Sequence, residues 1–389
     1  MKHPDHHIFQ HTPESLSEWC VERGMPAFRA KQILEWIYAK GVAAPAEMTN
    51  LSGGDRELLA REMTFLSGPT VAHQRATDGT QKLLIEWPDE LGAGAVPADE
   101  AAIDHSVRLP ILDEAGKPGE MPYSSSARQT ECVMIPSEDP SGPRRTACIS
   151  SQVGCPVGCR FCATGIGGLD GNLSAGRIVE QVWRLGRLPK VRRITNIVFM
   201  GMGEPLANFK AVTHAVRTIA APWGLGIGAR KITISTVGLP KAIHKLADEL
   251  DLQITLALSL HAPTDDVRRE LIPWSDYTTI AELLDACDAW FRKTGREITL
   301  EYILLAGVND QKEHAEALSL IAHKLRCTVN LLRYNEVEGL PFDRPASQDV
   351  HDFQQVLRSR GVRAHIRRSR GRDIAAACGQ LRHESRLGA

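Results

Sequence analysis

The second half of the chain alternates between short runs of apolar and β-branched residues and longer segments with helical periodicity. Between about residues 145 and 380 the apolar runs are TACISSQ, NIVFMG, KITIST, QITLALSL, ITLEYILL and VNLLRYN, and amphipathic helical segments lie between them. Alternation of this length predicts an α/β fold with a parallel sheet. Six such units predict a partial TIM-like (β/α)6 barrel over residues 145–389.

The first part of the chain shows two other patterns. Residues 1–65 are predicted to form an N-terminal helical module, because AFRAKQILEWIYAKG has one apolar stripe and ends at a glycine that can cap a helix. The stripe consists of Ala30, Ile33, Leu34 and Ile37. Residues 66–144 contain the β-type runs QKLLIEW and TECVMIP and predict a small β-rich connecting region. Within it, residues 92–127 are rich in Gly, Ala, Pro and Ser and predict a flexible surface insertion.

Composition and charge narrow the class of protein. The chain has 389 residues, of which 43% are hydrophobic and 24% charged, as expected for a soluble globular protein. It has no signal-like segment and no apolar run of about 18 residues, which predicts a cytoplasmic protein without a membrane partner. The net charge of −1 gives no support for a nucleic-acid partner. Locally, however, VRAHIRRSRGR at 362–372 carries five arginines and one histidine, a pattern typical of a solvated face or of a polyanion contact.

Polar and glycine-rich residues recur just after each predicted strand, as GCPVGCRFCATG, GMGEPLAN, STVG, SLHA, GVND and RYN. In a (β/α) barrel the C-terminal ends of the strands form the active-site face, so these six elements should meet at one opening. The first of them places Cys155, Cys159 and Cys162 in C-x-x-x-C-x-x-C spacing. Three thiolates suit a 4Fe-4S cluster with one iron open to a further ligand, or a structural zinc completed by a distant fourth cysteine.

These motifs, together with FRAKQILEWIYAKG, LLRYN and DIAAACGQL, resemble in order the RlmN/Cfr family of radical S-adenosylmethionine RNA methyltransferases. The resemblance covers nearly the whole chain outside residues 92–127. It implies that Cys155, Cys159 and Cys162 bind a 4Fe-4S cluster and that S-adenosylmethionine occupies the open iron. It further implies a set of contacts to S-adenosylmethionine: Gly203, Glu204, Ser235, Ser259, Leu260, His261 and Asn335.

The resemblance also implies a catalytic set of Glu131, Cys148 and Cys378. Cys378 would carry a methyl group from one S-adenosylmethionine, and a second one, cleaved to a radical, would activate that methyl group for addition to adenine. Cys148 would then attack the sulfur of Cys378, which forms a disulfide and frees the methylated base. Glu131 is expected to accept the adenine proton, although Cys148 is an alternative acceptor.

The expected activity is methylation of adenine C2 in 23S rRNA, and also in tRNA, with an electron donor such as flavodoxin or ferredoxin. Three alternatives remain open. A Cfr-type enzyme would methylate adenine C8, a noncatalytic RNA-binding protein would hold a structural zinc, and a radical enzyme for a small molecule would need no RNA. The other four cysteines, Cys20, Cys132, Cys287 and Cys327, have no motif context and are expected to be packing or surface thiols.

Overall fold

A ten-stranded sheet organises the computed structural model, which describes residues 1–89, 128–139 and 142–381. The predicted insertion at 92–127 lies outside the described residues. The strand order is β1-β2-β3-β4-β7-β8-β9-β10-β11-β12. The pairs from β1 to β4 are antiparallel, and every pair from β4 to β12 is parallel. The predicted parallel α/β architecture is therefore confirmed.

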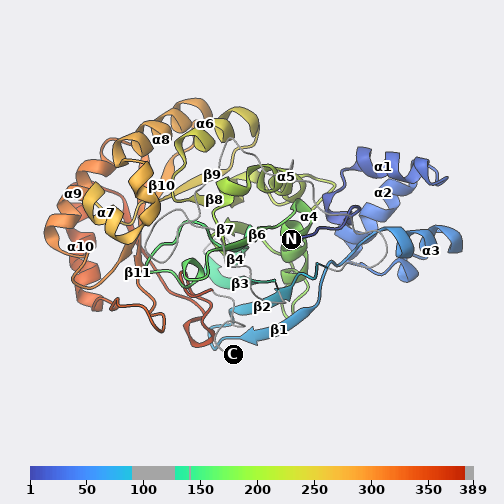
Figure 1. Ribbon diagram of the computed structural model, residues 1–389, viewed down its shortest axis with the longest axis horizontal. Helices are drawn as coiled ribbons and strands as arrows, with labels where there is room; N and C mark the ends of the chain where they lie inside the picture. Colours follow the sequence, from blue (N-terminus) through green and yellow to red (C-terminus); the bar gives the residue numbers. More distant parts are fainter. Residues whose placement is uncertain (90–127, 140–141, 382–389) are drawn as a thin grey trace.

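The parallel strands form the barrel wall, and helices cover its outer side (Figure 1). The strands are β4 (Gly142–Cys148), β7 (Asn196–Phe199), β8 (Ile232–Thr236), β9 (Thr255–Ser259), β10 (Ile298–Leu304), β11 (Cys327–Arg333) and β12 (Ala364–Arg367). The helices are α4 (Ala175–Leu185), α5 (Phe209–Ala220), α6 (Pro240–Glu249), α7 (Asp265–Leu271), α8 (Ile280–Thr294), α9 (Lys312–Ala322) and α10 (Ser347–Ser359). A small hairpin of β5 (Gln152–Gly154) and β6 (Leu169–Asn172) follows β4.

One strand was not among the six predicted. β12 lies within the arginine-rich segment and pairs in parallel with β11, from Val329↔Ala364 to Leu332↔Arg367. Its residues alternate between buried and more exposed positions, with Ala364 only 1% exposed. The segment is therefore partly barrel wall rather than only a charged face. Among the described residues β12 pairs with no strand other than β11, so the barrel stays open at this edge.

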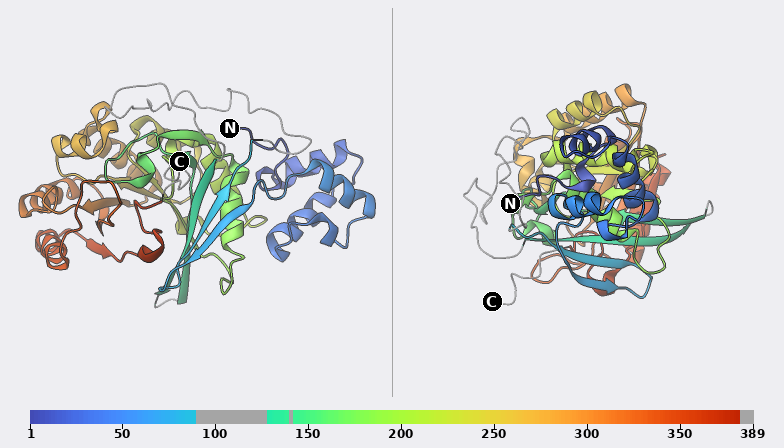
Figure 2. Two further views of the ribbon diagram at one scale, coloured as in Figure 1. Left: turned by 60° about the horizontal axis from the view of Figure 1, so that its bottom comes forward. Right: turned by 90° about the vertical axis from the view of Figure 1, so that its right-hand side faces the viewer.

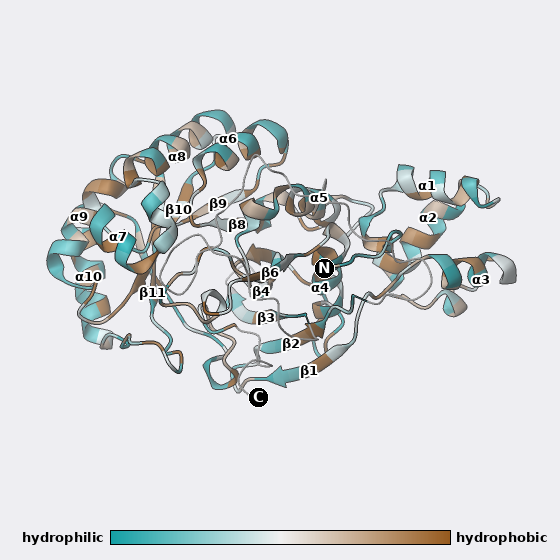
Figure 3. Ribbon diagram, in the orientation of Figure 1, coloured by the Kyte–Doolittle hydropathy of each residue, from teal (hydrophilic) through white to brown (hydrophobic). Residues whose placement is uncertain are grey.

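Helix signals in the sequence explain where the covering helices begin and end. The hydroxyl of Thr279 accepts from the backbone N–H of Glu282 and the Glu282 carboxylate accepts from that of Thr279, which is a capping box at the start of α8. Gly295 ends the same helix in the left-handed conformation. The covering helices are apolar toward the sheet and polar toward solvent, which Figure 3 shows by colour. The hydrophobic core therefore lies between helices and sheet.

The antiparallel strands extend the sheet away from the barrel. β1 (Thr70–Arg75), β2 (Gln81–Glu86) and β3 (Gln129–Asp139) form a long blade beside it (Figure 2). β2 is largely buried, whereas β1 is an exposed edge strand. A turn at residues 76–80 joins β1 to β2. This β1–β2 hairpin contacts the C-terminal segment of the chain, where the Thr77 hydroxyl donates to Asp373.

The N-terminal residues form helices α1 (Pro13–Glu22), α2 (Arg29–Leu34) and α3 (Gly53–Glu62), set to one side of the barrel (Figure 1). The predicted helix over AFRAKQILEWIYAKG continues from α2 into a π-helical turn, η2 (Glu35–Lys40), and ends at Gly41 with φ of 76°. All four residues of the predicted apolar stripe are buried. Both the stripe and the C-cap are confirmed.

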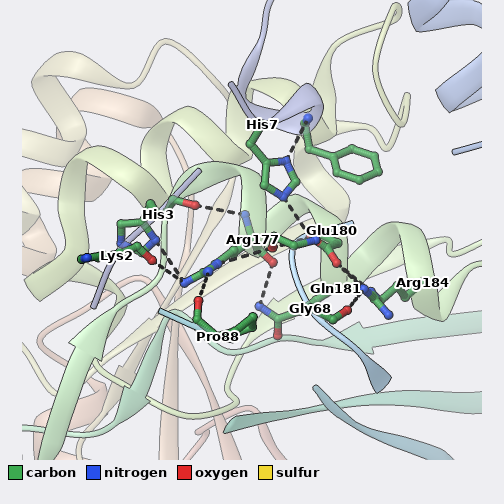
Figure 4. Close-up of polar contacts among 12 residues, drawn as sticks. Lys2, His3, His7, Gly68, Pro88, Arg177, Glu180, Gln181 and Arg184 are labelled. Atoms are coloured by element: carbon green, nitrogen blue, oxygen red, sulfur yellow. Dashed lines mark hydrogen bonds and ion pairs between the residues drawn. The ribbon is translucent and has the colours of Figure 1, made fainter. Parts of the chain in front are cut away.

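A buried polar network fixes this module to the barrel (Figure 4). The Glu180 carboxylate, on α4, accepts from His7 Nε2 at 2.9 Å and from the backbone and hydroxyl of Ser67 at 3.0 and 2.8 Å. Arg184 Nε donates to its other oxygen at 2.8 Å. Arg177 donates to the carbonyls of Lys2 and Pro88 at 3.1 and 3.2 Å. Burial would raise the pKa of Glu180, but the hydrogen bond from His7, the charge of Arg184 and the hydrogen bond from the Ser67 backbone outweigh it and lower that pKa.

Candidate active site

The three motif cysteines lie in the loop between β5 and the short helix η6 (Ala163–Gly165), each partly buried. They line a cavity of about 170 Å³ together with residues at the ends of β7, β8, β9 and β10, among them Phe199, Ser235, Ser259 and Glu301. This is the C-terminal face of the barrel, where the sequence placed the site. Burial raises the pKa of all three thiols, so binding a metal here would release protons.

The arrangement of these thiols bears on which metal they suit. A structural zinc needs four side chains around a single ion at about 2.0–2.3 Å. Over the described ranges, no group of three or more His, Cys, Asp or Glu side chains converges closely enough to hold one ion. A 4Fe-4S cluster distributes its thiolates over several irons and does not need that convergence. The three thiols are therefore compatible with a 4Fe-4S cluster.

The loop after β7 forms one wall of this cavity, and its conformation depends on a glycine. Gly203 has φ of 100°, and a Cβ at this position would lie 2.6 Å from Cβ of Gln152. The side chain of Gln152 accepts from the backbone N–H of Glu204 at 2.7 Å. The close approach of this loop to Gln152 thus requires glycine at position 203.

Glu204 is 3% exposed and its carboxylate is fixed at both oxygens. Oε1 accepts from the backbone N–H of Leu206 at 2.9 Å, and Oε2 accepts from that of Val237 at 2.8 Å. Burial raises the pKa of Glu204 to about 7, although these hydrogen bonds oppose the shift. Each oxygen keeps a second lone pair, so the carboxylate remains able to accept from the ammonium of a bound ligand.

The opposite wall comes from the ends of β8 and β9. The hydroxyls of Ser235 and Ser259 lie 3.2 Å apart. His261 has a left-handed backbone, with φ of 58°, and its Nδ1 accepts from the backbone N–H of Ile303 at 3.1 Å. Burial lowers the pKa of His261 to about 3, so the ring is neutral and its Nε2 carries the proton. His261 therefore presents a hydrogen-bond donor rather than a charge.

Two predicted cofactor contacts lie elsewhere. The side chain of Leu260 is fully buried in the hydrophobic core, outside the set of residues that lines the cavity. Asn335, at the end of β11, lines a second cavity and donates from Nδ2 to the carbonyl of Cys378 at 3.2 Å. Its Oδ1 accepts from Arg344 Nη1 at 2.9 Å. In this conformation Asn335 contacts the Cys378 segment. Because the Leu260 side chain is buried in the core, only the backbone of Leu260 could contact a cofactor.

A buried arginine provides a further test of whether the site fits a bound anion. Arg268, on α7, is fully buried and donates to the carbonyls of Val237 and Leu260 at 2.6 and 3.2 Å. Its Nη1 has no hydrogen-bond partner among the described residues, and its charge acts on the nearby Cys159. A buried cationic N–H without a partner is costly unless a ligand supplies an acceptor. The guanidinium lies outside the set of residues that lines the cavity, and its charge favours the anionic thiolate of Cys159, the form that binds a metal.

Cys378 connects the first cavity with the second. It lines the cavity that contains the three motif cysteines, and it also lines an adjoining cavity of about 70 Å³ that contains Cys148. The segment is tied to the cluster loop, because the backbone N–H of Ala163 donates to the carbonyl of Gly379 at 2.8 Å. The distant C-terminal cysteine is thus brought to the mouth of the barrel.

Cys148 ends β4 and is 6% exposed. Burial, followed by the neighbouring Cys378, raises the pKa of Cys148 to about 12, and the charge of Arg367 opposes that shift. Arg367 lies on β12 at the second cavity, where Glu301 pairs with it at 3.4 Å. A cation beside two thiols favours their reactive thiolate forms. All nine cysteines are free, so the implied disulfide between Cys148 and Cys378 is not formed here.

Glu131 lies behind the two cavities rather than in them. It is 2% exposed and pairs with Lys82 of β2 at 2.5 Å, and it is not among the residues lining either cavity. A direct proton transfer from the base to Glu131 would require this pair to open or a water to bridge the gap.

Three charged residues near the site were not predicted from the sequence: Lys82, Arg268 and Glu301. Arg367 was noted only as one of a run of arginines. Glu301 is the one acidic residue in the apolar run ITLEYILL, which was a usable signal. Lys82 and Arg268 gave no such signal, since charged residues within strands and helices are usually solvated.

Comparison with known proteins fits this geometry. A family model described as the radical SAM superfamily matches residues 149–318, and one described as the ribosomal RNA large subunit methyltransferase N-terminal domain matches residues 7–64. A radical SAM methyltransferase from Sphaerobacter thermophilus superimposes with a TM-score of 0.84 at 38% identity, covering 97% of this chain and 99% of that one. The chain is a radical S-adenosylmethionine enzyme, a class whose members use a 4Fe-4S cluster and S-adenosylmethionine.

The relatives define the family more narrowly. A probable dual-specificity RNA methyltransferase RlmN from Rhodopirellula baltica is 39% identical over 97% of this chain and 90% of its own length. The dual-specificity RNA methyltransferase RlmN of Dichelobacter nodosus is 37% identical over 96% and 93%. The chain belongs to the RlmN family of RNA methyltransferases, and the resemblance seen in the sequence is confirmed.

Proposed function

We propose that this protein methylates C2 of an adenine in 23S rRNA, and of tRNA as a second substrate, with Cys378 as the methyl carrier. The observation that supports this most directly is the position of Cys378, which borders both the cavity of the three motif cysteines and the cavity of Cys148. A methyl carrier must face its methyl donor and the residue that later releases it. No other cysteine lines both cavities.

Six residues of the first cavity then have a role in binding. Cys155, Cys159 and Cys162 would hold the cluster, and the bound cluster with S-adenosylmethionine supplies a radical able to abstract an unactivated hydrogen. Glu204 and His261 would accept from and donate to the cofactor, while Gly203 lets the backbone approach it. One S-adenosylmethionine methylates Cys378 and a second is cleaved, so two are consumed per turnover.

The second cavity supports the later steps. Cys148 would attack the sulfur of Cys378, which forms a disulfide and releases the methylated base. Arg367 beside both thiols favours the attacking thiolate. We keep Glu131 as the proposed proton acceptor. Its carboxylate pairs with Lys82 and does not line either cavity, so the proton would reach it after this pair opens or through a bridging water.

RNA binding would use positive charge at two places. Arg333, Arg367, Arg368 and Arg370 line the second cavity. A larger cavity of about 1010 Å³ between α2, η2 and the α4–α5 region is lined by Lys31, Lys40, Arg187, Arg192 and Arg193. Arg29, on α2, pairs with Asp55 at 3.1 Å. Phosphate contacts make affinity salt-dependent, and the target base must be unstacked to reach the barrel.

An electron donor such as flavodoxin or ferredoxin, and a cytoplasmic location, complete the proposal.

Over the described residues, no helix combines the length and apolar character that crossing a bilayer needs. The proposed division of the chain is into residues 1–65, 66–144 and 145–389, and its second boundary falls within β4 (Gly142–Cys148).

The test is RNA methylation by the anaerobically reconstituted protein, followed by nucleoside analysis. The expected product is 2-methyladenosine. Formation of 8-methyladenosine alone would establish the Cfr-type reaction instead, and consumption of S-adenosylmethionine that does not respond to RNA would indicate a small-molecule substrate. Iron and sulfide analysis of the same preparation separates both from a zinc-containing binding protein.

A second experiment tests the role of Cys148. Cys148→Ala should retain the cluster and the methylated Cys378 but accumulate RNA covalently bound to the protein. Cys287→Ala is the matched control, because Cys287 is a fully buried thiol on α8. Full-rate turnover without trapped RNA in Cys148→Ala would contradict the assigned role.

A further inference from the structure

The turn of the β1–β2 hairpin contacts residues 370–378, the segment that leads to Cys378. The backbone N–H and the hydroxyl of Thr77 both donate to Asp373 Oδ2, at 2.9 and 3.0 Å. The backbone N–H of Gly371 donates to Asp78 Oδ2 at 3.1 Å, and Arg370 pairs with the same oxygen at 3.9 Å. These contacts join parts of the chain that are almost 300 residues apart in sequence.

The same hairpin also contacts this segment through a buried lysine, Lys82 of β2. Lys82 Nζ donates to the carbonyl of Ala375 at 3.3 Å and pairs with Glu131 at 2.5 Å. The side chains of Lys82 and Glu131 are only 4% and 3% exposed. Lysine is rarely this buried unless it is paired and hydrogen-bonded, so both partners are needed to hold it there. Lys82 is therefore a fixed point against which the segment rests.

The segment combines internal hydrogen bonds, such as that from the Ala376 N–H to the carbonyl of Gly371 at 2.9 Å, with conformations that need outside support. Ala375 has φ of 48°, in the left-handed region that an alanine seldom adopts. Gly371 has φ of 66°, and a Cβ there would lie 2.8 Å from the Thr80 side chain of the hairpin. Such conformations persist where the surroundings impose them. The hairpin supplies those surroundings on one side, and Asn335, which donates to the carbonyl of Cys378, supplies them on the other.

The two strands of the hairpin differ in what they contribute. β1 is the edge strand of the sheet and its residues are mostly exposed, so its own burial contributes little to the core. β2 is largely buried and pairs with β3, so it anchors the hairpin in the sheet. The turn between them makes the hydrogen bonds with Asp373 and Gly371 described above, and it therefore joins the segment that carries the reactive thiol to this anchored strand.

We propose that the β1–β2 hairpin, through Thr77, Asp78 and Lys82, is a positioning element that holds Cys378 at the boundary between the two cavities. One consequence of this inference, that methyl transfer is coupled to cofactor cleavage, rests on the proposed function. The restraint of the thiol itself is a property of the fold.

The experiment measures alkylation of Cys378 by iodoacetamide in the cluster-loaded protein, mapped by peptide mass spectrometry, without RNA or S-adenosylmethionine. Thr77→Val and Asp373→Asn should speed it about threefold to tenfold, as expected when hydrogen bonds of ordinary strength no longer oppose local opening. Both positions are exposed, so these variants should fold. Lys82→Met should have a larger effect.

Two controls separate positioning from general stability. Asp349→Asn removes an exposed carboxylate that accepts a backbone N–H from Ala346 at 3.1 Å, far from the site, and should leave alkylation unchanged. Thr77→Ser keeps the hydroxyl and should restore the wild-type rate. Equal alkylation in Thr77→Val, Asp373→Asn and Asp349→Asn would overturn the proposal.

A second measurement tests the catalytic consequence. In Thr77→Val and Asp373→Asn, the ratio of methylated adenosine to released 5′-deoxyadenosine should fall several-fold while 5′-deoxyadenosine formation continues. An unchanged ratio with faster alkylation would overturn the coupling of the two steps, whereas the restraint of Cys378 by the hairpin would stand. If the wild-type protein methylates no RNA, the proposed function fails, and alkylation alone still decides whether the hairpin restrains Cys378.

Discussion

Replacing Glu180 by glutamine should weaken the attachment of the helical module to the barrel. The carboxylate is fully buried and accepts from His7, Ser67 and Arg184. The backbone N–H of Phe9 donates to His7 Nδ1, so His7 Nε2 carries a proton and is a donor. Both carboxylate oxygens of Glu180 face donors, His7 and Ser67 on one side and Arg184 on the other. The NH₂ group of a glutamine must therefore face donors on one of these two sides, where it can form no hydrogen bond with them. Disrupting a buried charged pair in this way costs about 3–5 kcal/mol.

The assay is urea unfolding followed by tryptophan fluorescence, with hydrogen exchange of residues 7–64 measured in parallel. Glu316→Gln is the control, since Glu316 is 38% exposed and pairs with Arg360 at 3.0 Å. A surface pair of this kind contributes about 0–1 kcal/mol. If Glu180→Gln lowers the free energy of unfolding no more than Glu316→Gln, or leaves exchange in residues 7–64 unchanged, the reasoning is refuted.

The same network predicts a dependence on pH. The pKa of Glu180 is lowered in the folded protein. Its contribution to stability is therefore complete above the unfolded carboxyl pKa of about 4.3 and is lost as the pH falls through the lower folded pKa. The wild-type protein should lose stability more steeply below about pH 4 than Glu180→Gln does. Parallel acid-unfolding curves would contradict this account.

Three further predictions concern the active site. Cys378→Ala should lose methyl transfer yet keep its iron content and its cleavage of S-adenosylmethionine; loss of the cluster would instead identify Cys378 as a fourth ligand. Gly203→Ala should weaken S-adenosylmethionine binding at least tenfold in equilibrium binding, because the added Cβ meets Gln152 at 2.6 Å, and unchanged affinity would count against this wall of the cavity. Arg367→Gln should prolong the covalent RNA adduct in a quenched time course, because the charge that opposes the raised pKa of Cys148 is removed. An adduct that decays at the wild-type rate would exclude that role for Arg367.

Hydrophobic patterning predicted most of the barrel because each strand–helix unit carries its own periodicity. It missed β12, since four residues flanked by arginines form a strand only through pairing with β11. The cysteine motif likewise carried its chemistry in local spacing. By contrast, the burial of Lys82 against Glu131 depends on how β2 and β3 pair across the sheet, with Leu84 opposite Glu131. Spacing along the chain contains no trace of such a contact.

The distance in sequence between Thr77 and Asp373, 296 positions, has a consequence for biogenesis. During synthesis the loop of Cys155, Cys159 and Cys162 emerges long before the segment that closes over it, and closing so long a loop is entropically costly. Iron and sulfide delivery therefore has an interval in which the nascent site is accessible. Docking of the tail onto the hairpin would end that interval, so a slow-docking variant should tolerate late cluster assembly better than the native chain.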